Sequence, residues 1–138
     1  MYLRSALKLA IPYAIQDRQA MERAYRGEGP EAAEAVADCA RLQALRGIAP
    51  AKFTADQRET ARLALIWAEQ HLFGYLDAIK GVYKAETTEA KAHMKLLRKV
   101  RMEHFGKTQG EAMSEKAILV DVMEVTKYLP PSATSQGR

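Results

Sequence analysis

The chain has 138 residues, of which 48% are hydrophobic and 28% charged, and its formal net charge is +4 at neutral pH. This composition is typical of a single globular domain and excludes a disordered or fibrous protein. The one cysteine, Cys39, excludes an internal disulfide framework and is typical of a reducing compartment. We expect Cys39 to be a small buried hydrophobe rather than a reactive thiol.

A short apolar run at residues 9–15 is the stretch that most resembles a targeting segment. It contains Pro12 and lacks a small-x-small cleavage site after it. Elsewhere the sequence has no run close to the roughly 18 apolar residues that cross a membrane. We therefore expect a cytoplasmic protein without a membrane partner.

Apolar residues recur at the three-four spacing of an α-helix along nearly the whole chain, which predicts an all-α bundle. Pro12 should kink the first helix or make it restart, because proline removes a backbone donor. A polar tail at 130–138 should be mobile and should follow a single helical domain at 1–129. The helices are expected at approximately 2–25, 30–46, 54–83, 87–105 and 108–129.

The third helix, residues 54–83, is the predicted centre of the bundle. Its apolar residues cover more than half of a helical wheel, which is too wide an arc for a helix on the surface. Thr54 and Gln57 form a capping box that predicts its start. A narrow charged stripe should face solvent, and it consists of Glu59, Arg62, Glu69, Asp77 and Lys80.

The second helix is rich in alanine and begins with Pro30, at a position where the missing N–H costs nothing. Its small side chains should let it approach the central helix closely. The predicted apolar face comprises Ala32, Ala33, Val36, Cys39, Ala40 and Leu42.

The last predicted helix has an unusually wide apolar face. Residues 117–125 are rich in β-branched side chains, so helix and strand both stay open there, although the helical spacing is regular. A terminal helix with such a face often completes a dimer, and the alternative is packing within its own bundle. The candidate self-association face consists of Ile118, Leu119, Val122, Met123, Val125 and Leu129.

The fourth helix carries a basic ridge, in which five cations lie within about 100° of arc. A ridge of this kind can contact the phosphates of a nucleic acid or an acidic partner, and the alternative is a solvated face. Aromatic residues that would stack on bases do not interleave with it. Arg101 lies on the apolar side of the same helix, where it needs a carboxylate partner or an intermolecular one. The ridge consists of Lys84, Lys91, Lys95, Arg98 and Lys99.

No catalytic, cofactor or metal signature stands out. Glu86, Glu89 and His93 share one flank of the fourth helix, but this spacing is common in helix-surface ion pairs, and the Glu-x-x-His spacing of di-iron bundles does not occur. His71 lies among apolar residues, so we expect a hydrogen-bonded core histidine.

Paired carboxylates allow a third interpretation, because helical nucleotide pyrophosphohydrolases hold magnesium with such pairs. Here the pairs are Glu31 and Glu34 with Asp38, and Asp121 with Glu124. All of them are expected to point toward solvent rather than into a cavity.

Taken together, the sequence favours a non-enzymatic binding or regulatory protein that acts through protein–protein contacts as a homodimer. The alternative from another class is a nucleic-acid-binding protein that uses the basic ridge. A metal-dependent nucleotide hydrolase ranks third.

Overall fold

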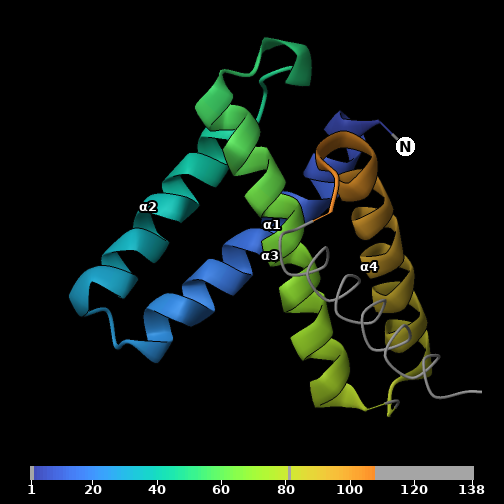
Figure 1. Cartoon of the computed structure of the whole chain (residues 1–138). Coiled ribbons are helices and arrows are strands. Elements are labelled where there is room, and N and C mark those ends of the chain that lie inside the picture. Colours follow the sequence, from blue (N-terminus) through green and yellow to red (C-terminus); the bar gives the residue numbers. More distant parts are fainter. Residues whose placement is uncertain (1, 81, 108–138) are drawn as a thin grey trace, which may run out of the picture. The chain divides into compact units, whose positions relative to one another are not determined.

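The computed structural model describes residues 2–80 and 82–107, and these residues form helices without strands. The all-α prediction is confirmed. The predicted fifth helix at 108–129, the helix-or-strand question at 117–125 and the tail at 130–138 fall outside the described residues. In chain order the elements are α1 (Leu3–Ala24), α2 (Gly29–Leu45), the 3-10 turn η1 (Pro50–Lys52), α3 (Ala55–Ile79) and α4 (Lys84–Phe105) (Figure 1).

The four long helices belong to one unit, Met1–Phe105. Within it α1 and α3 each contact all three other long helices, while α2 packs mainly on α1 and α4 mainly on α3. Figure 1 shows α1 and α3 crossing, with α2 and α4 on opposite sides. The centre of this unit is therefore a pair of helices, and the predicted central helix is one member of that pair.

Alanines occupy the buried faces of both central helices. On each helix three alanines are fully buried at spacings of three or four residues, so they lie along one stripe. Side chains of this size allow two helix backbones to approach closely. Gly74 of α3 takes no part in this approach, because it lies on the exposed side, where an added Cβ would meet no atom within 4 Å. The two stripes are Ala6, Ala10 and Ala14 on α1, and Ala61, Ala64 and Ala68 on α3.

The ends of the helices follow local backbone chemistry. The predicted capping box is confirmed, because Gln57 N donates to Thr54 Oγ1 at 3.2 Å and Thr54 N donates to Gln57 Oε1 at 3.0 Å. Lys80 takes a left-handed conformation (φ +42°) and ends α3 earlier than expected. The next helix accordingly begins at Lys84 rather than at Thr87.

The predicted restart at Pro12 does not occur, since α1 runs through it as one helix. Pro12 lies on the exposed side of α1, and so does Lys8, whose carbonyl loses its helical partner. That carbonyl can bond to water, which makes the interruption inexpensive.

The buried face of α2 is rotated from the expected one. Val36 is 51% exposed, and Ala33 and Ala40 are exposed as well, whereas Asp38 is buried. The expectation that Asp38 points to solvent is therefore wrong. Asp38 tolerates burial because Arg41 Nη1 donates to its Oδ1 at 2.8 Å and Arg18 lies 3.9 Å from its other oxygen.

Glu69 is likewise buried, although it was expected in the solvent-facing stripe of α3. It is the carboxylate that Arg101 of α4 requires. Arg101 is 2% exposed, and its Nε donates to Glu69 Oε2 at 3.1 Å, while Arg98 Nε donates to Glu69 Oε1 at 3.1 Å. A buried ion pair thus joins α3 to α4.

We predict that Glu69→Gln lowers the free energy of unfolding by about 3 kcal/mol, because it removes a carboxylate that pairs with the buried Arg101 guanidinium. Urea unfolding followed by circular dichroism measures this change. The control is Glu59→Gln, which removes an exposed ion pair with Arg62 on the same helix and should cost less than about 1 kcal/mol. Equal losses for the two variants would contradict the assigned role of Glu69.

Candidate functional site

The basic ridge lies on the exposed side of α4. Lys84, Lys91, Lys95 and Lys99 are all exposed, and among the described residues no carboxylate lies within 4.0 Å of their ammonium groups. Arg98 is exposed as well, but it is engaged with Glu69. From Lys84 to Lys99 the ridge extends about 22 Å along the helix axis. The structure therefore brings all five candidate contacts onto one surface, with four of the charges available to a partner.

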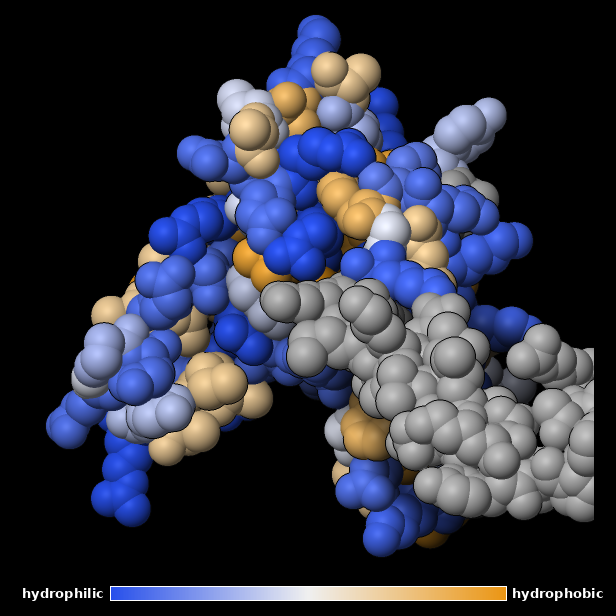
Figure 2. Space-filling model, in the orientation of Figure 1, coloured by the Kyte–Doolittle hydropathy of each residue, from blue (hydrophilic) through white to orange (hydrophobic). Residues whose placement is uncertain are grey.

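The far end of the α3–α4 hairpin exposes large apolar side chains. Buried residues of α3 stop at Leu72. Beyond it Phe73 is 68% exposed, and Val82 and Tyr83 in the connection to α4 are 74% and 58% exposed. Figure 2 shows a mainly hydrophilic visible face with small, separate hydrophobic areas. We call Phe73, Val82 and Tyr83 the hairpin patch.

A polar hollow of about 260 Å³ lies where α1, α3 and α4 meet. The Tyr13 ring stacks on His71, with centroids 5.7 Å apart, and the Tyr13 hydroxyl shares a 3.1 Å hydrogen bond with His93 Nδ1. His93 Nε2 lies 4.0 Å from a carboxylate oxygen of Glu89, in line with the expected helix-surface pair. The lining residues are Tyr13, Gln16, His71, Leu72, Tyr75, Glu86, Glu89 and Ala90.

Burial in the hollow favours the neutral forms of Tyr13 and His71. Burial lowers the pKa of His71, and Asp17 opposes this only in part. Burial, followed by the charges of Glu89 and Tyr75, raises the pKa of Tyr13. His71 was expected to be a hydrogen-bonded core histidine. It is instead half-buried, and its ring stacks on the Tyr13 ring.

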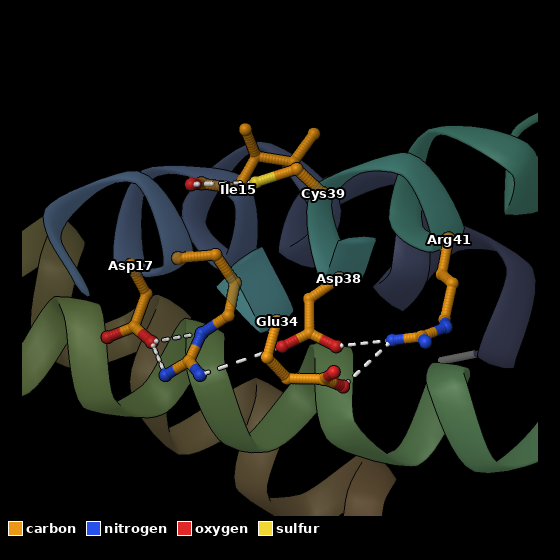
Figure 3. Close-up of polar contacts among 7 residues, drawn as sticks. Ile15, Asp17, Glu34, Asp38, Cys39 and Arg41 are labelled. Carbon is orange, nitrogen blue, oxygen red and sulfur yellow. Dashed lines mark hydrogen bonds and ion pairs between the residues drawn. The ribbon is translucent and has the colours of Figure 1, made fainter. Parts of the chain in front are cut away.

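A second polar cluster joins α1 to α2 (Figure 3). Arg41 donates to both Glu34 and Asp38, at 3.1 and 2.8 Å. Arg18 pairs with Asp17 at 2.5 Å and lies 4.4 Å from the centre of the Trp67 ring of α3, a cation–π contact. Guanidinium groups therefore pair with all three carboxylates of this cluster.

The pKa values in this cluster have mixed causes. Burial raises the pKa of Asp38, Glu34 raises it further, and Arg41 and Arg18 partly offset both effects. Burial also raises the pKa of the Cys39 thiol, whose Sγ lies 3.9 Å from the Ile15 carbonyl oxygen. A raised pKa leaves little thiolate, as expected for an unreactive cysteine, although Cys39 is half-buried rather than fully buried.

Within residues 2–80 and 82–107, no three metal-ligating side chains come together. None of the helices described is long and apolar enough to span a membrane. No protein-family model, curated protein or solved structure matches the chain.

We predict that His71 titrates below about pH 6.5 in the folded protein and near 6.5 in urea, because burial disfavours its charged form. Between the two pKa values the unfolded chain binds more protons than the native one, so this contribution to stability is lost as the pH falls below about 6.5. NMR titration of the imidazole carbon-bound protons measures both pKa values. A folded value at or above the unfolded one would contradict the assigned burial.

Proposed function

We propose that this protein is a non-enzymatic binding or regulatory protein that acts through protein–protein contacts of its helices and associates with a second copy of itself. The observation that carries the proposal is the hairpin patch. Exposed apolar groups that gather at one place mark interaction sites more often than scattered single ones do. Burying a side chain of this size contributes about 1.5–3 kcal/mol, so a few of them can support an interface.

The charges beside the patch favour a second copy as the partner. Asp77, Lys80, Lys84 and Glu86 flank it in sequence and are exposed, so two acidic and two basic residues lie at its edge. A two-fold interface places the same surface on both sides, and a balanced set of charges can then pair with its own copy. An edge with charges of only one sign would repel the same edge of the second copy.

The predicted face on the last helix belongs to the same proposal. Its residues, Ile118, Leu119, Val122, Met123, Val125 and Leu129, lie outside the described part of the chain. That face stays a prediction and is not needed for the hairpin patch to be tested.

We predict that the double variant Phe73→Glu and Val82→Glu shifts the protein from dimer to monomer, because it places two like charges in the contact from each copy. Size-exclusion chromatography with light scattering gives the mass directly. Val36→Glu is the matched control: Val36 is also an exposed apolar residue, but it lies on α2. A wild-type protein that stays monomeric, or a dimer that both variants leave intact, would contradict the proposal.

A second candidate function is nucleic-acid binding by the basic ridge. It is favoured by the four exposed lysines of α4 that have no carboxylate nearby among the described residues. Four phosphate contacts release counterions and make the affinity depend steeply on salt.

We predict that, if this second function holds, duplex DNA binding weakens roughly 100-fold between about 50 and 200 mM salt, as four contacts require. Fluorescence anisotropy measures the affinity. The triple variant Lys91→Glu, Lys95→Glu and Lys99→Glu should abolish binding, whereas Lys52→Glu, an exposed lysine on η1, should change it little. Absent binding at low salt excludes this function.

A further inference from the structure

A cavity suited to a small molecule lies on another side of the helices. It has a volume of about 470 Å³ and lies between the first half of α1, the end of α2 and the connector that leads to α3. This volume falls within the 300–1,000 Å³ that is usual for ligand pockets. Its lining residues are Arg4, Leu7, Lys8, Ile11, Leu45, Arg46, Gly47, Ile48, Pro50 and Phe53.

The floor of this cavity is apolar. Leu7, Ile11 and Leu45 belong to the hydrophobic core and are almost completely buried. Ile48 and Phe53 of the connector add half-buried walls. A hydrocarbon or aromatic group placed here would exchange water for side-chain contacts, at about 25 cal/mol per Å² of apolar area removed from water.

The rim carries charge of one sign. Arg4 and Lys8 are exposed one helical turn apart on α1, and Arg46 is exposed at the end of α2. No carboxylate lines the cavity, and within the described residues none lies within 4.0 Å of these three cationic groups. Arg4 also lies in the first turn of α1, where the helix N-terminus adds partial positive charge and the first turn holds no acidic residue.

An apolar floor below a purely cationic rim defines the class of ligand. We propose that this cavity binds a small amphiphilic anion, with its carboxylate held by Lys8 and Arg46 and its acyl or aryl body on Leu7, Ile11 and Leu45. A neutral apolar molecule would leave the three cations without partners. A small inorganic anion would leave the floor in water.

The proposal does not depend on self-association, because the cavity and the hairpin patch share no residue. Arg41 offers a useful contrast. It also lies on α2, but Glu34 and Asp38 already neutralise it. The cations of the rim differ from it, because no carboxylate among the described residues lies within 4.0 Å of them.

The test is isothermal titration calorimetry of the full chain with sodium decanoate, decanol and sodium acetate, each below its solubility or micelle limit. Decanoate should bind at least about tenfold more tightly than either decanol or acetate, a difference of about 1.4 kcal/mol. Lys8→Glu with Arg46→Glu should weaken decanoate binding by about tenfold or more. Lys52→Glu, which lies outside the cavity, should leave it unchanged.

One further variant and one vesicle-binding measurement complete the test. Ile48→Asp places a carboxylate in a connector wall rather than in the core, so the fold should survive, and decanoate binding should be lost. Vesicles of phosphatidylglycerol separate a free amphiphile from a lipid surface: vesicle binding without decanoate binding would overturn the proposal. Equal affinity for decanoate and decanol, or decanoate binding that is insensitive to the rim variants, would overturn it as well.

Discussion

The close contact of α1 with α3 is the constraint on which the rest of this unit depends. Six fully buried alanines form two stripes that let these helices approach closely. Larger residues, among them Leu42, Leu65 and Leu97, belong to the same hydrophobic core. Away from the contact the helices diverge. Residues of α1 and of other elements line both the polar hollow and the cationic-rimmed cavity.

Charged groups fix the two outer helices. On one side Asp38 of α2 meets Arg18 of α1, and on the other Glu69 of α3 meets Arg101 of α4. Burying ions costs solvation energy that the pair only partly recovers, so such pairs are poor sources of stability. They do oppose a sliding or rotated packing, because a shift would separate these paired charges. We interpret them as devices that select one arrangement of α2 and α4 on the central pair.

Features set by residues close together in the sequence could be predicted from it, whereas features that combine residues far apart could not. Helical spacing and the Thr54 capping box are local, and both were predicted correctly. Val36 and Asp38 were assigned to the wrong faces, because hydropathy cannot anticipate that Arg18 and Arg41 would neutralise a buried carboxylate. The five residues of the basic ridge could be recognised in the sequence because one helix carries them all. The Tyr13–His71–His93 cluster and the cationic-rimmed cavity could not, since each combines residues from elements far apart in sequence.

The order in which the chain is synthesised gives the α1–α3 contact another meaning. α1 and α2 are neighbours in sequence and can pair as soon as both leave the ribosome, but the alanine stripe of α1 has to wait until α3 has been made, more than 45 residues later. Contacts across such a separation form late because they carry the entropy of closing a long loop. The nascent hairpin of α1 and α2 therefore exposes the three alanines of this stripe, whose single methyl groups give other chains little apolar surface to bind.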